Sequence, residues 1–133
     1  MKELLLVEDD YLDVESVKRA LKKIDVEVIL NVAHNGVDAL ASITSKDKML
    51  PDIIILDINM PKMNGVEFLG IIKSYYSLKN IKVFVLTTSA EDYDKIAMHN
   101  LGIEGYILKP LDFTKEGGDD TGKLLAELKA INI

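Results

Sequence analysis

The sequence has no cysteine in its 133 residues, which excludes disulfide bonds, zinc sites with thiolate ligands and catalysis by a thiol. It also has no apolar run near the roughly 20 residues that a membrane-spanning helix needs, so we expect no membrane partner. The apolar run that follows Met1 is too short for the core of a signal peptide and leads straight into acidic residues. Together these absences predict a cytoplasmic protein.

Clusters of basic residues are absent as well. The sequence holds 16 Lys and Arg against 22 Asp and Glu, a formal net charge of -6. A nucleic-acid surface needs grouped Lys and Arg to meet the phosphate backbone, so we expect no nucleic-acid partner. The length and the 48% of hydrophobic residues suit one domain with its own core. We expect a single domain over residues 1–133 with no fused output domain, because the chain ends soon after its last amphipathic segment.

Short apolar runs alternate with segments of helical period along the chain. Runs that are apolar throughout and bounded by turn residues are typical of strands buried on both faces. We expect strands at Lys2–Val7, Val26–Ala33, Asp52–Leu56, Lys82–Leu86 and Glu104–Leu108. Between them apolar residues recur every three or four positions, which indicates amphipathic helices. We expect these at 11–24, 37–43, 65–76, 90–101 and, from about Asp120, to 131.

Strands that alternate with helices predict an α/β fold, in which helices cover both faces of a parallel sheet. The expected fold class is a doubly wound, flavodoxin-like sheet of five strands with five helices. Asp10 is placed to cap the first helix. The last helix should start late, because Gly117, Gly118 and Gly122 each cost up to about 1 kcal/mol in a helix interior. Residues 114–122 should therefore form a long loop.

Chemically capable side chains close four of the predicted strands. Glu8–Asp10 follow the first strand, Asp57 the third, Thr87 the fourth and Lys109 the fifth. In an open parallel sheet, ligands bind beyond the carboxyl ends of the strands, near the point where the strand order reverses. If the first and third strands are neighbours there, the carboxylates, a hydroxyl and an ammonium share one crevice.

Crowded carboxylates repel one another unless a cation lies between them. Hard oxygen ligands at a solvent-open site suit Mg²⁺, which also recruits phosphate oxygens. A metal ion and a lysine can neutralise the charge of a transferring phosphoryl group, and a carboxylate can itself be the nucleophile. Asp57 is the natural nucleophile, because it stands alone at the end of the most apolar strand. The residues thus point to an aspartyl phosphate.

Each of these residues also has an ordinary interpretation. An acidic run after a strand is commonly a helix cap, and a strand-terminal Asp is commonly a turn former. Thr87 would suit any strand, and Lys109 could be a solvated charge. No one of them identifies a site alone, but their joint occurrence at the same end of successive strands favours the functional interpretation.

Four segments together resemble the receiver domains of bacterial and archaeal response regulators. These segments are Val7–Asp10, Leu56–Gly65, Leu86–Ser89 and Gly105–Pro110. The likeness extends to about Phe113, and the segment that begins at Asp57 and ends in glycine is highly specific. The runs Asn59-Met60-Pro61 and Thr87-Thr88-Ser89 are most similar to stand-alone receivers paired with phytochrome-like sensor kinases.

The resemblance implies the strand order 2-1-3-4-5, as in the chemotaxis member of that family, and it implies roles for individual residues. Asp57 accepts a phosphoryl group from a sensor histidine kinase or a histidine phosphotransfer protein. Asp9 and Asp10 form an acidic pair for Mg²⁺, with Asp57 and the backbone carbonyl of Asn59 as further ligands. Asn59 and Ser89 tune the attack of water on the acyl phosphate. Such a domain catalyses its own phosphorylation and slow hydrolysis but turns over no independent substrate, so it is not an enzyme.

The resemblance also implies a response to phosphorylation. Thr87 and Lys109 bind phosphoryl oxygens, and Pro110 follows a cis peptide bond that aims Lys109 into the site. Tyr106 is the switch aromatic residue, expected inward when Thr87 moves toward the phosphoryl group. The implied output surface is the fourth helix, fifth strand and last helix of a monomer or weak homodimer, whose downstream protein target the sequence does not name.

Three other classes of protein fit these residues less well. A Mg²⁺-dependent phosphatase with an Asp nucleophile needs a second Asp two residues on, where this chain has Asn59. A receiver-like binding module that acts without phosphorylation would lack at least one of the site residues, all of which are present. A flavin-binding protein on a similar sheet needs a phosphate loop after the first strand, where Glu8–Asp10 would repel a phosphate.

Overall fold

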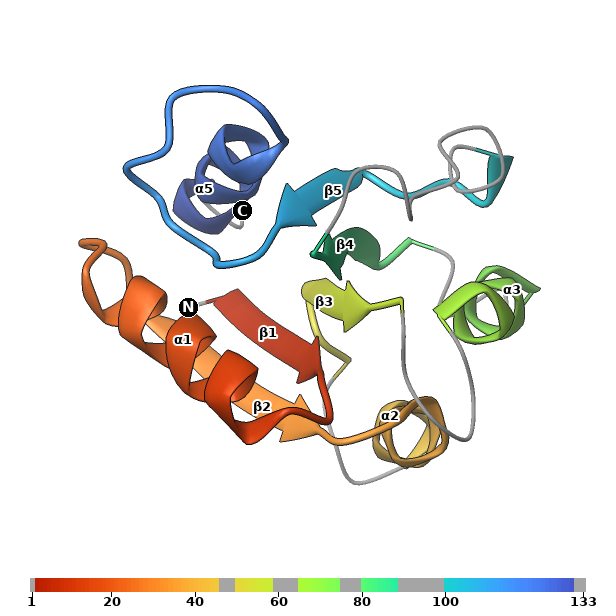
Figure 1. The fold of residues 1–133 in the computed structure, drawn as a ribbon. Helices are drawn as coiled ribbons and strands as arrows, with labels where there is room; N and C mark the ends of the chain where they lie inside the picture. The colour runs from red at the N-terminus through yellow and green to blue at the C-terminus, as the bar shows by residue number, and fades with distance from the viewer. Residues whose placement is uncertain (1, 46–49, 59–64, 75–79, 89–99, 131–133) are drawn as a thin grey trace.

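The computed structural model describes residues 2–45, 50–58, 65–74, 80–88 and 100–130. The strands are β1 Lys2–Val7, β2 Val28–Ala33, β3 Ile53–Asp57, β4 Lys82–Thr87 and β5 Gly105–Leu108. They pair in parallel in one sheet of order β2-β1-β3-β4-β5 (Figure 1). The five strands and their order are those predicted, so the doubly wound, flavodoxin-like fold class is confirmed.

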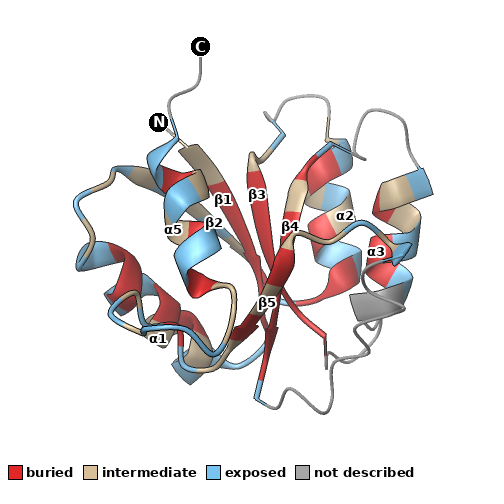
Figure 2. Ribbon diagram, turned by 90° about the horizontal axis from the view of Figure 1, so that it is seen from above, coloured by how far each residue is buried: buried red, intermediate tan, exposed pale blue. Residues whose placement is uncertain are grey.

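Four helices lie within the described residues: α1 Tyr11–Lys22, α2 Gly36–Thr44, α3 Gly65–Ser74 and α5 Thr121–Lys129. α1 and α5 cover one face of the sheet, and α2 and α3 cover the other (Figure 2). The fifth predicted helix, over residues 90–101, lies outside the described residues except for its last two positions. Within the described ranges, no helix is both long enough and apolar enough to span a membrane.

The strands feed two apolar cores, because successive side chains of a strand point to opposite faces. Leu4 and Leu6 of β1 pack with α1 and α5, whereas Leu5 and Val7 pack with α2 and α3. β3 is buried along its whole length, and its first four residues, Ile53–Leu56, are all apolar rather than alternating, as is typical of a strand covered on both faces. Burying one such Leu or Ile contributes roughly 1.5–3 kcal/mol relative to leaving it exposed. The two cores therefore fix the position of each strand.

The register of the sheet brings the carboxyl ends of its strands to one edge. Val7 of β1 lies opposite Leu56 of β3, so continuing this register by one residue sets Glu8 beside Asp57. On the other side of β1, the pairing with β2 does extend to Glu8, because the backbone N–H of Glu8 donates to the carbonyl of Ala33, 2.9 Å away. Glu8 and Asp57 therefore lie at the same edge of the sheet, because the apolar residues that precede them in β1 and β3 are paired in register.

The starts of α1 and α5 follow the sequence signals. Asp10 is the N-cap of α1, and its Oδ1 accepts hydrogen bonds from the backbone N–H groups of Leu12 and Asp13 at 2.8 and 3.3 Å. α5 begins only at Thr121, after the N-cap position Asp120. The predicted cap and the predicted late start of the last helix are therefore both confirmed.

The loop between β5 and α5 runs along the outer edge of β5, an edge that no strand covers within the described residues. Asp120 exchanges two bonds with Tyr106: its Oδ2 accepts from the Tyr106 N–H and its own N–H donates to the Tyr106 carbonyl, both at 2.9 Å. Oδ2 of Asp119 accepts from the N–H of Leu108 at 2.8 Å. These carboxylates satisfy edge N–H groups that would otherwise be open to pairing with another chain.

Candidate functional site

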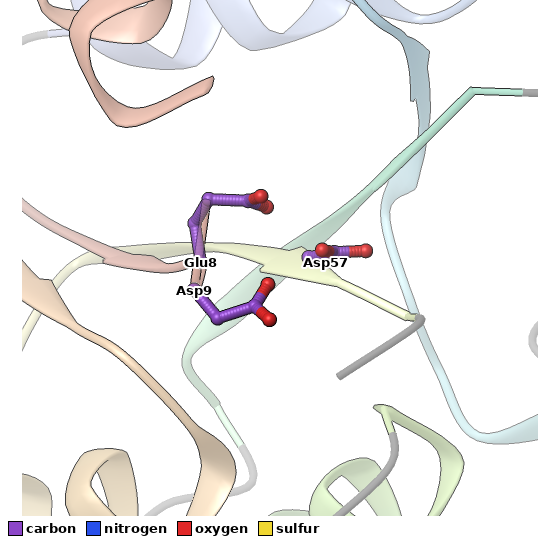
Figure 3. Close-up of side chains that lie close together, drawn as sticks. All are labelled: Glu8, Asp9 and Asp57. Carbon is purple, nitrogen blue, oxygen red and sulfur yellow. The ribbon is translucent and has the colours of Figure 1, made fainter. Parts of the chain in front are cut away.

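Three carboxylates meet where β1 and β3 end. Glu8, Asp9 and Asp57 each offer one oxygen atom, and these atoms all lie within 4.8 Å of one another. Figure 3 shows the side chains of Glu8 and Asp9 reaching from the end of β1 toward the side of Asp57. Glu8 is 0% exposed and Asp57 is 4% exposed, whereas Asp9 is exposed to solvent. The cluster is thus buried on one side and open on the other.

Glu8 is the most deeply buried member of this cluster. Its Oε1 accepts from the ammonium of Lys109 at 3.2 Å, while its Oε2 is buried with no hydrogen-bond partner among the described residues. Burial and then the neighbouring Asp57 carboxylate raise the pKa of Glu8 to about 8, and the charge of Lys109 opposes them only in part. Without a cation, the site therefore favours a protonated Glu8.

Lys109 supplies the positive charge of the site. Its Nζ lies 2.7 Å from Oδ2 of Asp13, 3.2 Å from Oε1 of Glu8 and 3.6 Å from Oδ2 of Asp57. Burial alone would lower the pKa of Lys109, but the hydrogen bond to Asp13 and the charges of all three carboxylates outweigh it and raise that pKa. The ammonium of Lys109 therefore stays charged. The peptide bond from Lys109 to Pro110 is cis, as predicted.

Thr87 and Tyr106, the two predicted switch residues, lie on the neighbouring strands β4 and β5. Thr87 is fully buried at the end of β4, and its carbonyl accepts from the N–H of Lys109 at 2.8 Å. Tyr106 is half-buried and packs against the core on the α2 and α3 side. Its hydroxyl donates to the carbonyl of Gly118 at 3.1 Å, a contact that no sequence pattern indicated.

The structure brings Asp9, Asp57 and Lys109 together, as expected, but it does not bring Asp10 into the cluster. Asp10 begins α1, and its carboxylate is used as the helix cap. Glu8, which was not among the predicted metal ligands, lies in the cluster with Asp9 and Asp57 instead. The signal that could have identified Glu8 is the period of β1: the side chains of residues 4 and 6 face α1 and α5, so residue 8 faces the same way.

Asp13 is a second residue that the sequence analysis missed. It lies on the first turn of α1, where only the orientation of the helix over the sheet brings its carboxylate to Lys109. Asn59 and Ser89, which were predicted to complete the metal ligands and to tune hydrolysis, lie outside the described residues. Their roles stay predictions.

Comparison with known proteins identifies the family. The chain matches the response regulator receiver domain over residues 4–115. It belongs to this family. Receiver domains are signalling modules of two-component systems rather than classical enzymes, which agrees with the predicted class of protein.

Individual relatives support this receiver assignment. Response regulator Rcp1 of Synechocystis sp. is 37% identical over 112 residues, which are 81% of this chain and 76% of Rcp1. A two-component response regulator from Legionella pneumophila is 36% identical with a TM-score of 0.82, over 98% of this chain and 100% of that one. The Mn(2+)-bound form of Rcp1 is 31% identical with a TM-score of 0.79, over 100% of this chain and 99% of that one.

A solved structure of the phosphorylated cyanobacterial phytochrome response regulator RcpA is also similar. It is 31% identical with a TM-score of 0.74, over 96% of this chain and 89% of that one. The similarity to phytochrome response regulators predicted from the sequence is therefore confirmed. Several other curated relatives are longer, and this receiver chain spans only 13% to 50% of their length.

Proposed function

We propose that Asp57 of this receiver domain is the phosphoacceptor of a two-component phosphorelay, and that its phosphorylation changes the surface that the domain presents. The observation that carries this proposal is the placement of the buried Asp57 carboxylate between two kinds of group. An acidic pair, Glu8 and Asp9, lies within 4.8 Å of it, and the ammonium of Lys109 lies 3.6 Å from its Oδ2. A nucleophile, a cation site and a fixed positive charge are the parts that phosphoryl transfer requires.

A divalent cation fits the acidic side of the site. The donor set is three carboxylates, which are hard oxygen ligands of the kind that Mg²⁺ prefers, and the buried Oε2 of Glu8 has no hydrogen-bond partner in the described part of the chain. Glu8, Asp9 and Asp57 would hold the ion, with the carbonyl of Asn59 as the predicted further ligand. When bound, Mg²⁺ would offset negative charge on the phosphoryl oxygens. The solved Mn(2+)-bound form of the relative Rcp1 supports a divalent ion here.

The chain's own residues would carry the transfer as follows. An oxygen of Asp57 attacks the phosphorus of a phosphohistidine on a sensor histidine kinase or a histidine phosphotransfer protein. The P–N bond breaks as the O–P bond forms, and the leaving imidazole takes up a proton from solvent. Lys109 offsets charge on the phosphoryl oxygens as a compact cation. The solved phosphorylated form of the relative RcpA supports phosphorylation as the reaction of this site.

The response would then be a population shift between two states. The Thr87 hydroxyl would follow a phosphoryl oxygen, and Tyr106 on the neighbouring strand β5 would move with it. The domain would serve as its own catalyst for phosphorylation and hydrolysis, without a separate substrate. A cytoplasmic location and a monomeric or weakly dimeric state remain predictions from the sequence.

Phosphorylation with acetyl phosphate tests this function. Intact mass is recorded with Mg²⁺ and with excess EDTA for the wild type, for Asp57→Asn and for the control Asp25→Asn, which changes an exposed Asp far along the chain from the site. We expect a gain of one phosphoryl mass in the wild type and in Asp25→Asn that needs Mg²⁺ and is absent in Asp57→Asn. A gain that persists in Asp57→Asn would show that another residue is the acceptor. No gain in folded wild type, even with a phosphorylated histidine kinase as donor, would favour a binding module that acts without phosphorylation.

A further inference from the structure

The carboxylate nearest to the Lys109 ammonium belongs to Asp13, not to the site cluster. Nζ of Lys109 lies 2.7 Å from Oδ2 of Asp13 but 3.6 Å from Oδ2 of Asp57. The Asp13 side chain is 34% exposed and that of Lys109 is 14% exposed, so the pair lies at the rim of the site and not in open solvent. Asp13 is not one of the three residues whose oxygens converge on the cation position.

Asp13 is held in place by its helix. Its N–H donates to the N-cap residue Asp10 at 3.3 Å, and the next residue, Val14, is buried in the core beneath α1. A carboxylate in the first turn is also favoured by the helix dipole. The Lys109 backbone is fixed by the hydrogen bond from its N–H to the carbonyl of Thr87, but its long side chain has several rotatable bonds and reaches Asp13 only through its terminal ammonium. When the pair separates, the flexible lysine side chain is therefore the partner that moves.

The ammonium of Lys109 has three hydrogens to donate, and carboxylates compete for them. In the unphosphorylated domain the shortest contact goes to Asp13, the next to Glu8 and the longest to Asp57. Once Asp57 carries a phosphoryl group, about two negative charges and several strong acceptor oxygens lie beside Lys109. In the phosphorylated domain, the single and partly exposed carboxylate of Asp13 therefore competes less well for the Lys109 ammonium than the phosphoryl group does.

We infer that Asp13 is a positioning residue that draws Lys109 away from Asp57 in the unphosphorylated domain and thereby slows phosphorylation. The inference rests on the proposed function of Asp57. As Lys109 turns toward the incoming phosphoryl group it gives up its contact with Asp13, which stays in place on the first turn of α1. Asp13 thus lowers the rate at which this domain is phosphorylated.

The test compares phosphorylation rates of four proteins with acetyl phosphate at saturating Mg²⁺, followed by intact mass over time. Asp13→Asn should react about three- to tenfold faster than wild type, which is the rate equivalent of losing a partly exposed charge pair. Asp13→Glu should keep most of the slow rate, because it keeps the charge. Glu15→Gln is the matched control: it removes the same charge from the same helix, but Glu15 contacts Lys18 at 3.6 Å. Its rate should equal that of wild type.

A double-variant comparison separates an action through Lys109 from general repulsion of the anionic donor. In a Lys109→Gln background, Asp13→Asn should no longer accelerate the reaction, although all rates fall. An acceleration that persists there, or a rate of Asp13→Asn equal to or below wild type, overturns the inference. If Asp13→Asn does not fold, Asp13→Ser gives the same comparison. Absence of labelling in wild type would instead remove the proposed function and, with it, the inference.

Discussion

The hydroxyl of Tyr106 donates a hydrogen bond to the backbone carbonyl of Gly118, 3.1 Å away, so the aromatic residue of β5 is tied directly to the loop that precedes α5. The backbone of Tyr106 is bonded to the same loop through Asp120. A movement of the Tyr106 side chain would break the first link and leave the backbone links in place. The side-chain link can therefore be tested separately from the fold of the loop.

Tyr106→Phe should loosen the loop without unfolding the domain. The substitution removes one hydrogen bond near the surface, which contributes about 0.5–1 kcal/mol. We expect faster amide hydrogen exchange over residues 113–120 and a change of that size in the free energy of unfolding. Tyr11→Phe, which removes the hydroxyl of an exposed tyrosine, is the control and should leave exchange in this loop unchanged. Equal exchange in Tyr106→Phe and wild type would mean that the hydroxyl does not hold the loop.

Asp119 is expected to be the main anchor of the same loop. Its side chain is 1% exposed and accepts hydrogen bonds from the N–H of Leu108 at 2.8 Å, the N–H of Thr121 at 3.0 Å and the ammonium of Lys115 at 2.8 Å. Asp119→Asn can keep only part of this pattern and should lower the free energy of unfolding at pH 7 by about 1–3 kcal/mol. Chemical denaturation measures the change, and Glu116→Gln, on an exposed residue of the loop, should leave stability nearly unchanged.

The acid dependence of stability provides a separate test of Asp119. Burial would raise the pKa of Asp119, but Lys115 and the backbone donors outweigh it and hold that pKa below the ordinary value of 3.8. The folded state then binds fewer protons than the unfolded state, so the stabilisation is full above about pH 4 and is lost as the pH falls through the folded pKa. Asp119→Asn should therefore lose less stability than wild type on acidification below pH 4. Parallel acid curves for the two proteins would contradict this assignment.

The sequence was sufficient for the sheet but not for the details of its carboxyl edge. Strands such as β3 are buried on both faces, and an uninterrupted apolar run in the sequence predicts such burial. Whether Glu8 or Asp10 lies beside Asp57 depends on where the backbone pairing of β1 stops. The pairing extends one residue beyond Val7, to Glu8. The end of an apolar run in the sequence does not show where the pairing stops. A charged residue that still pairs with the neighbouring strand cannot be told apart, in the sequence, from the first residue of the loop.

Contacts between segments that are distant in the chain could not be predicted from the sequence, for a different reason. Asp13 and Lys109 are 96 positions apart, and their meeting depends on how α1 lies across the sheet. The bonds of Asp119 and Asp120 to the edge of β5 likewise depend on the path of the loop. The glycine-rich composition predicted a loop and a late α5, but composition does not state which backbone groups a loop will satisfy.

Gly105 should tolerate no side chain. A Cβ built at this position would lie 2.5 Å from Oδ2 and 2.6 Å from Cβ of Asp120, which is closer than packed atoms approach, so the loop would have to move away from β5. Gly105→Ala should therefore destabilise the domain by about 1–3 kcal/mol. Gly70→Ala is the matched control: a Cβ there meets nothing within 4 Å on α3, and Ala is favoured over Gly in helices by about 0.5–1 kcal/mol. Thermal unfolding should show opposite signs for the two variants, and a neutral Gly105→Ala would mean that the loop adapts.

Glu8 should make both stability and metal binding depend on pH. Burial and then the Asp57 carboxylate raise the pKa of Glu8 from 4.5 to about 8. Between these values the folded, metal-free protein binds one proton more than the unfolded chain, so its stability falls as the pH rises across this interval. Glu8→Gln replaces the protonated carboxyl with a neutral amide of the same shape. At pH 8 the metal-free variant should therefore be more stable than wild type by about 1–3 kcal/mol.

Mg²⁺ would bind the ionised form of Glu8, so binding at pH 7 should release about one proton per ion. Calorimetric titration in two buffers of different ionisation enthalpy measures this number, and the affinity should increase from pH 6 to pH 8. Asp9→Asn is the matched control, because it removes an exposed carboxylate of the proposed cation site and should weaken binding while the proton is still released. Glu8→Gln should weaken binding and abolish the release. A wild type that binds Mg²⁺ at pH 7 without releasing a proton would show that Glu8 is not a ligand, and the cation position would then rest on Asp9 and Asp57 alone.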